Sequence, residues 1–257
     1  MKLGLVTYNL ASDWDIDTLI ERCRETGFTG VEPRTSHAHG IETSLTQQQR
    51  EAVKQRFAEA GIDLVQIGTA YEYHSLDPDE VQKNIEGTKE AVLLAKDLGI
   101  AGVKVRPNGV QTDQGVPIEK TLEQIGKAAG QCAAFAADHG VEIRMEVHGR
   151  VTQHVPYIRA ILDAGDHPNL KVTWNCNDGE TDDTGSIKTN FDLLKNDIGL
   201  VHIQDIGVPR YPWQELFTLL KGIGYDDYFC AEIQPIDQPV RLMHYYKTVF
   251  DGLVRHA

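Results

Sequence analysis

EIRMEVHG, residues 142–149, combines the two features that point to the fold: a short apolar run and a carboxylate, Glu146, near its end. Each of the next three strand-like runs also ends in a polar side chain and leads into a helix-like pattern. These runs are LKVTWN at 170–175 with Asn175, LVHIQ at 200–204 with His202, and YFCAEI at 228–233 with Glu232. Polar side chains from four successive strand ends converge on one point only if the strands close into a barrel. The pattern therefore predicts a (β/α)8 TIM barrel with these residues at its C-terminal mouth.

Strand-like and helix-like segments alternate along the whole chain, eight of each. The expected strands are residues 3–8, 30–34, 63–69, 102–107, 142–147, 170–175, 200–204 and 228–233. The expected helices are residues 15–26, 46–60, 79–98, 118–139, 152–164, 187–195, 213–222 and 239–254. Strict alternation indicates parallel strands joined by helical crossovers, and the count of eight favours a barrel over an open sheet. The chain has 257 residues, close to the roughly 250 of one such barrel, so we expect a single α/β domain over residues 1–257.

The composition argues against several classes of function. A net charge of -13 leaves no overall basic footprint for nucleic acid. The four cysteines are scattered without a CxxC pair, which argues against a zinc knuckle and for a reduced compartment. No run approaches the roughly 20 apolar residues of a membrane span, and the N-terminus is a poor secretory signal. We therefore expect a cytoplasmic protein with no nucleic-acid or membrane partner, and a homo-oligomer is compatible with such a barrel.

The four strand-end residues are candidate ligands of one divalent metal ion. Carboxylate, amide oxygen and imidazole suit Mn, Mg, Co or Zn, and no thiolate favours a softer site. Glu146 and Glu232 lie inside apolar runs, where a glutamate is almost never fully buried unless it is paired. Asn175 is the weakest candidate because a turn residue explains it equally well, and the nearby Asp178 is an alternative ligand or a residue that positions one. Replacing His202 or Glu232 by alanine should then abolish metal binding and leave the fold intact.

Further polar side chains follow the other strands, where they would surround a polyhydroxylated substrate at the same mouth. The candidates for substrate binding are Glu72, His74, Arg106, Asn108, His148, Asp178 and Asp205. Four aromatic residues are candidates for stacking on a sugar, although core packing is their commoner role: Tyr71, Tyr73, Trp174 and Trp213. The acidic run at 178–183 is expected to be a solvent-exposed loop.

The chain resembles the xylose isomerase-like barrel superfamily, in its sugar phosphate isomerase/epimerase branch. The resemblance spans the whole chain and rests on LGLVTYNL near the N-terminus, GFTGVEPR, RMEVHG, VHIQD and the final AEI. It implies that a Glu, Asp, His, Glu set holds one divalent ion, and the matching residues here are Glu146, Asn175, His202 and Glu232. Asn175 departs from this pattern, because the family usually has Asp there. The loss of one carboxylate lowers the negative charge available to a metal.

The resemblance further implies proton transfer next to a carbonyl group. The metal would polarise the substrate oxygens and stabilise an ene-diolate, while Glu146 and Glu232 remove and return the proton from opposite sides. This is the chemistry of an isomerase or epimerase of a sugar or keto-sugar. A lyase or hydrolase acting on an oxidised sugar or glycoside uses the same residues and stays open. An abasic-site endonuclease, which needs a three-metal cluster, and a non-catalytic binding barrel are less favoured, and the sequence does not name the sugar.

Overall fold

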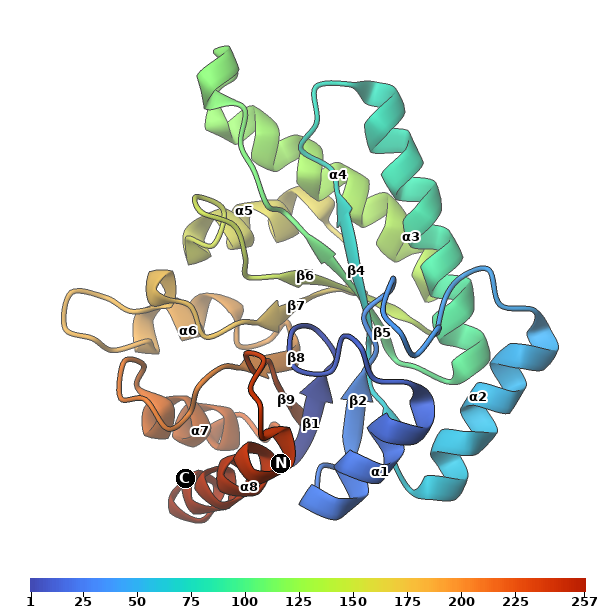
Figure 1. Ribbon diagram of the computed structural model, residues 1–257. Coiled ribbons are helices and arrows are strands. Elements are labelled where there is room, and N and C mark those ends of the chain that lie inside the picture. Colours follow the sequence, from blue (N-terminus) through green and yellow to red (C-terminus); the bar gives the residue numbers. More distant parts are fainter.

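The strands lie at the centre of the molecule and the helices surround them (Figure 1). The computed structural model describes residues 1–257. The strands, all parallel, are β1 (Lys2–Val6), β2 (Gly30–Glu32), β3 (Asp63–Leu64), β4 (Ile67–Glu72), β5 (Gly102–Arg106), β6 (Glu142–Glu146), β7 (Leu170–Trp174), β8 (Ile198–Ile203) and β9 (Tyr228–Ala231). The α-helices are α1 (Ile16–Thr26), α2 (Gln47–Ala60), α3 (Pro78–Leu98), α4 (Ile118–Ala137), α5 (Val155–Gly165), α6 (Lys188–Leu194), α7 (Trp213–Gly222) and α8 (Pro239–His256). Two short 3-10 turns, η1 (Thr112–Gln114) and η2 (Asp178–Glu180), follow β5 and β7.

The barrel closes through one segment, residues 63–72, that changes partner along its length. In the hydrogen-bonded order of the sheet, β3-β2-β1-β9-β8-β7-β6-β5-β4, the two halves of this segment stand at opposite ends. β3 pairs with β2, whereas β4 pairs with β5, and a bridge between Arg34 and Gly68 joins the two ends. The single strand expected at 63–69 is therefore two short strands, because the segment leaves β2 for β5 at residues 65–66.

The eight helices form a closed outer ring as well. Each helix contacts the next one along the chain, and α8 returns to contact α1. Local sequence sets several helix ends: Thr46 caps α2 through a capping box with Gln49, Asp77 caps α3 ahead of Pro78, and glycines in the left-handed region end α1, α2 and α3. None of the helices is both long and apolar enough to cross a membrane. The predicted (β/α)8 barrel is confirmed.

The barrel wall separates two apolar regions. The large core lies between the strands and the helices, and a small cluster lies inside the barrel, from Tyr228 at the N-terminal end of β9 up to Val6 at the C-terminal end of β1. This inner cluster consists of Val6, Val65, Leu200, Tyr228 and Cys230. The Tyr228 ring lies so close to β2 that a Cβ atom at Gly30 would be 2.4 Å from it. Toward the C-terminal ends of the strands, the inward-facing positions become polar, and they form the candidate site.

Candidate active site

Polar side chains point into the barrel from six of its strands, at positions from the middle of the strand, as for Lys104, to just after its C-terminal end. They are Glu32 on β2, Lys104 on β5, Glu146 on β6, Asn175 after β7, His202 on β8 and Glu232 after β9. Strand alternation sends their apolar neighbours outward to the helices and these side chains inward. All except Glu232 are buried, so they form one polar layer inside the mouth.

His202 lies at the centre of this polar layer. Its Nε2 atom is 2.7 Å from Glu32 Oε2, and its Nδ1 atom is 3.1 Å from Asn175 Oδ1 and 3.3 Å from Glu146 Oε1. An ionised carboxylate only accepts hydrogen bonds, so Nε2 donates to Glu32. Burial alone would lower the pKa of His202, but the Glu32 and Glu146 carboxylates outweigh burial and raise this pKa to about 10.

Lys104 and Glu146 form a buried ion pair beside His202. Lys104 Nζ donates to Glu146 Oε2 at 2.9 Å, and the two side chains are 9% and 3% exposed. Burial would raise the pKa of Glu146, but the Lys104 ammonium and His202 overcome burial and hold this pKa well below its usual range. Without substrate, Glu146 is therefore a carboxylate at physiological pH.

Gln66 joins the polar layer to Arg144 and Thr173, which lie on β6 and β7. Its Nε2 atom donates to Glu32 Oε2 at 3.0 Å, and its Oε1 atom accepts from Arg144 and Thr173 at 3.3 Å each. Glu32 is thus held by two donors, Gln66 and His202. A Cβ atom at Gly68 would lie 2.9 Å from Glu32 Oε1, so glycine is needed there to make room for the carboxylate.

Glu232 lies where two hollows of the mouth meet. The inner hollow, about 50 Å³, is lined by Val6, Tyr8, Glu32, Arg34, Lys104, Arg106, Glu146, His148 and Glu232. The outer hollow, about 400 Å³, is lined by Tyr8, Asn9, Gln204, Asp205, Arg210, Glu232 and Gln234. Burial raises the pKa of Glu232, and although His202 opposes this, the Glu146 carboxylate adds to it. The environments of the two glutamates thus displace their pKa values in opposite directions, as expected of an acid–base pair.

Five of the seven residues predicted to bind substrate form one cluster on the wall of the mouth. Glu72 pairs with Arg106, accepts from Asn108 Nδ2 at 2.9 Å, and lies 3.6 Å from His74 Nδ1. Asn108 Oδ1 in turn lies 3.1 Å from His148 Nδ1. Of these five, Arg106 and His148 line the inner hollow.

The other two predicted substrate-binding residues lie apart from this cluster. Asp205 is exposed and lines the outer hollow. Asp178 is exposed at the start of η2 and lines neither hollow.

The aromatic residues considered for stacking are not available to a sugar. Tyr73 and Trp174 are fully buried in the outer core, and Trp213 is 6% exposed. Tyr71 is half-buried against α3, where a Cβ atom at Gly87 would touch its ring. The aromatic side chain that lines both hollows is Tyr8, which is 42% exposed.

The four predicted metal ligands do not form the expected four-ligand site. Glu146, Asn175 and His202 lie together, but Lys104 holds the second oxygen of Glu146. No three His, Cys, Asp or Glu side chains in the chain converge as ligands of an ion. As arranged, Glu146 is neutralised by Lys104 and Asn175 offers an amide in place of a carboxylate, so the set does not fit the divalent ion that the sequence predicted.

The acidic run at 178–183 is not wholly exposed, because Glu180 is completely buried. Tyr211 donates to Glu180 Oε2 at 2.6 Å and accepts from Trp174 Nε1 at 2.9 Å. The backbone N–H of Asn175 donates to Glu180 Oε1 at 3.3 Å. Burial raises the pKa of Glu180 to about 8. The network joins the loop after β7 to the segment after β8, which is the strand that carries His202.

Several residues of the mouth were not predicted from the sequence, among them Glu32, Lys104, Arg34 and Tyr8. Lys104 lies between two valines and Glu32 follows Val31 in an apolar strand. This is the same signal, a charge inside an apolar run, that identified Glu146. Nothing in the sequence distinguishes Tyr8 from the aromatic residues of the core.

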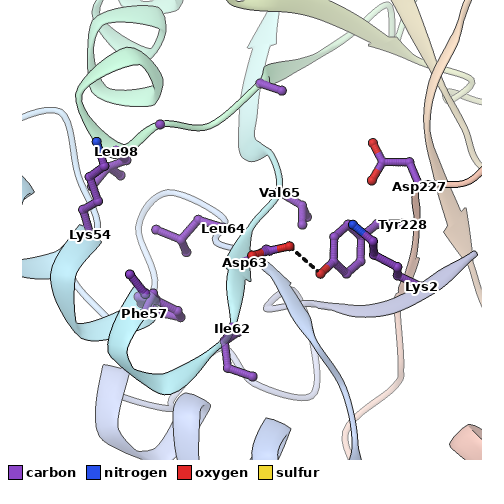
Figure 2. Close-up of a pocket in the computed structure, with 13 residues that line it drawn as sticks. Lys2, Lys54, Phe57, Ile62, Asp63, Leu64, Val65, Leu98, Asp227 and Tyr228 are labelled. Carbon is purple, nitrogen blue, oxygen red and sulfur yellow. Dashed lines mark hydrogen bonds between the residues drawn. The ribbon is translucent and has the colours of Figure 1, made fainter.

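A separate hollow of about 360 Å³ lies at the opposite, N-terminal end of the barrel (Figure 2). The Tyr228 hydroxyl donates to Asp63 Oδ2 at 2.8 Å in this hollow, and its charged residues Lys2, Lys54, Asp63 and Asp227 are exposed. No buried set of acids and bases meets there. The C-terminal mouth is therefore the candidate active site, as in other barrels of this class.

Several solved structures share the fold over nearly their whole length. An L-ribulose 3-epimerase matches with a TM-score of 0.81 at 16% identity, over 99% of this chain and 95% of that chain. The D-psicose 3-epimerase of Clostridium cellulolyticum H10, solved with D-tagatose, matches with a TM-score of 0.79 at 17% identity, over 100% and 99%. The IOLI protein with a bound zinc atom matches with a TM-score of 0.74 at 17% identity, over 99% and 98%. Likeness at these identities shows the fold alone.

The family itself is shown by the sequence rather than by these superpositions. The family model described as the xylose isomerase-like TIM barrel matches residues 20–247, which include all six polar residues of the mouth layer. The chain therefore belongs to the xylose isomerase-like TIM barrel family, in agreement with the resemblance of its motifs.

Proposed function

We propose that the chain is an isomerase or epimerase that acts on a sugar or keto-sugar by proton transfer next to a carbonyl group. The observation that carries this proposal is the pair Glu146 and Glu232, which line one hollow and have pKa values displaced in opposite directions. Solved structures of the same fold include epimerases of L-ribulose and D-psicose, and one of them contains D-tagatose. They support a small carbohydrate as the substrate class.

In this mechanism Glu232 is the group that exchanges the proton. Its raised pKa lies closer to neutrality than that of an ordinary glutamate, which suits a general acid–base. The carboxylate takes the proton from the carbon next to the carbonyl, the C–H electron pair becomes the C=C bond, and the carbonyl electrons move to oxygen to form an ene-diolate. Return of this proton by Glu232 to the former carbonyl carbon, while a proton passes from the neighbouring hydroxyl to the former carbonyl oxygen, gives the isomer. Delivery of a proton to the first carbon from its opposite face gives the epimer, and Glu146 is the second carboxyl group of the hollow that can deliver it.

Glu146 has a different task from Glu232. Because Lys104 and His202 hold it as a stable carboxylate, it is a weak base and a strong hydrogen-bond acceptor. We assign Glu146 to orient a substrate hydroxyl. It exchanges the second proton with the substrate only when the substrate displaces Lys104 and His202 from its carboxylate. Arg34, Arg106 and His148 line the same hollow and can donate to further substrate oxygens.

A divalent ion is not part of this mechanism, although the sequence predicted one. The donors that would hold it are engaged with Lys104 and with each other. Every step of the proton transfer uses groups of the chain itself.

The proposal is tested by incubating the protein with a panel of ketoses and aldoses in D2O. We expect an isomer or epimer with one deuterium at the carbon next to the carbonyl, observed by NMR and mass spectrometry. Glu232→Gln should lower turnover by about 10²- to 10⁴-fold, the usual contribution of a general acid–base. Glu123→Gln, on the exposed surface of α4, is the control and should keep full turnover.

Two results would contradict this proposal. Full turnover in Glu232→Gln would remove Glu232 from the chemistry. A product of lower mass than the substrate would show cleavage or elimination, which is the chemistry of a lyase or hydrolase.

A further inference from the structure

The charged side chains of the mouth assign a role to Lys104, a residue that was not among the site residues predicted from the sequence. We infer that Lys104 is the resident cation of this site: its ammonium neutralises Glu146 and faces the reacting substrate oxygen, in the role that a divalent ion has in a metal-dependent isomerase. The part concerning the substrate oxygen rests on the proposed function. The part concerning charge and metal affinity is independent of it.

The position of Lys104 is the first reason for this assignment. The residue lies on β5 between two outward-facing valines, so its side chain is directed into the barrel by a buried strand rather than by a loop. Its Nζ atom donates to Glu146 Oε2 at 2.9 Å, and this is its one hydrogen bond within the protein. An ammonium has three N–H donors. Since Lys104 lines the inner hollow, the remaining donors are free to meet a substrate oxygen there.

The charge of the polar layer is the second reason. Glu146 already has its counter-charge in Lys104, whose Nζ atom lies 2.9 Å from Glu146 Oε2. A divalent ion bound by Glu146 would meet this ammonium inside a region of low dielectric constant, where repulsion between like charges is strong. Asn175 adds to this effect because an amide replaces the carboxylate that the family pattern has.

Stability does not explain the buried ion pair, which is the third reason. Removing two charges from water costs about as much as their attraction returns, so such pairs are weak contributors to folding. A preorganised cation aimed at the oxygen where charge develops, in contrast, is among the largest contributions to catalysis. The Lys104–Glu146 pair is 9% and 3% exposed at the rim of a hollow, where it fits the second role.

Calorimetry with Mn²⁺ on protein freed of metal by chelation tests the effect of charge without any substrate. The wild-type protein should bind Mn²⁺ no more tightly than about millimolar, and Lys104→Gln, which keeps a donor for Glu146 without the charge, should bind at least about tenfold more tightly. Lys127→Gln is the matched control, because Lys127 lies on α4 with 68% of its side chain exposed and should leave the affinity unchanged. Binding of one Mn²⁺ per chain at micromolar affinity in the wild type, or weaker binding in Lys104→Gln, would overturn the inference.

Turnover tests the second part of the role. Chelated wild-type protein should keep its full turnover, and Lys104→Gln should lose at least about 100-fold in kcat with little change in KM. A turnover that needs added metal would overturn the inference even if the sugar chemistry is as proposed. If no sugar is turned over, the proposed function fails, and the Mn²⁺ affinities still decide whether Lys104 excludes a divalent ion. If Lys104→Gln does not fold, as a thermal melt would show, the wild-type affinity decides alone.

Discussion

Replacement of Glu180 by glutamine should make the protein more stable at neutral and alkaline pH. Glu180 is completely buried and has no cationic partner; its carboxyl meets the Tyr211 hydroxyl and backbone N–H groups of the loop after β7. Burial raises its pKa to about 8 from an ordinary value of 4.5. Glutamine has nearly the same shape as the protonated acid: its oxygen still accepts from the Asn175 N–H, and its amide nitrogen donates to a Tyr211 hydroxyl that turns to accept. Unlike glutamate, it never has to carry a charge in this buried environment.

The magnitude follows from the difference between these two pKa values. Between pH 4.5 and 8 the folded protein holds the Glu180 proton more tightly than the unfolded chain does. The stabilisation from this proton is complete below pH 4.5, declines as pH rises, and is lost above pH 8. At about 1.4 kcal/mol per pH unit, the difference of 8 minus 4.5 gives about 5 kcal/mol over the whole window.

Urea unfolding followed by circular dichroism at a series of pH values between 5 and 9 measures this dependence. The free energy of unfolding of Glu180→Gln should exceed that of the wild type by an amount that grows with pH and levels off above pH 8. Asp178→Asn is the matched control, because Asp178 is an exposed carboxylate on the same turn, and it should leave the pH dependence as it is. A constant difference between Glu180→Gln and the wild type across the series would refute the reasoning.

Two further predictions concern His202 in the polar layer and the contact between Gly30 and Tyr228. His202→Ala should lower the free energy of unfolding by about 3 to 5 kcal/mol, because Glu32 stays buried without its cation; this replaces the expectation of an intact fold, and an unchanged urea midpoint would count against it. Gly30→Ala should destabilise by about 1 to 3 kcal/mol because the new methyl group would lie 2.4 Å from the Tyr228 ring. Gly252→Ala, in α8 with nothing within 4 Å, should instead stabilise by about 1 kcal/mol. Thermal melts of these two glycine variants should therefore shift in opposite directions, and shifts of the same sign would show that contact with Tyr228 is not the cause.

Local sequence was sufficient to predict most of the elements and their order. The helix at 213–222 has the expected bounds, and the helix expected at 46–60 begins one residue later because Thr46 is its cap. The helix expected at 152–164 begins only at Val155. The strand at 63–69 could not be predicted as two, because its division reflects a change of partner between strands that are distant in the sequence.

The candidate site was predictable in part. Charges inside apolar strands identified Glu146 and His202, and the same signal was present at Glu32 and Lys104 without being used. What that signal lacks is the identity of the partner across the barrel. Lys104 and Glu146 are 42 residues apart, and His202 and Glu32 are 170 residues apart, so a charge that resembles a free ligand in the sequence proves to be one half of a pair.

The sequence by itself determined the class of fold and the end of the barrel at which polar side chains gather, because alternation, helix caps and apolar periodicity are local properties of the chain. Only the tertiary structure decided what those side chains do to one another. Closure of the barrel brings the ammonium of Lys104 to Glu146 and the imidazole of His202 between two carboxylates. It also buries Glu180 under Tyr211, which lies 31 residues further along the chain. Electrostatic interactions depend on distance in space and on exclusion of water, and neither quantity is present in the order of the residues.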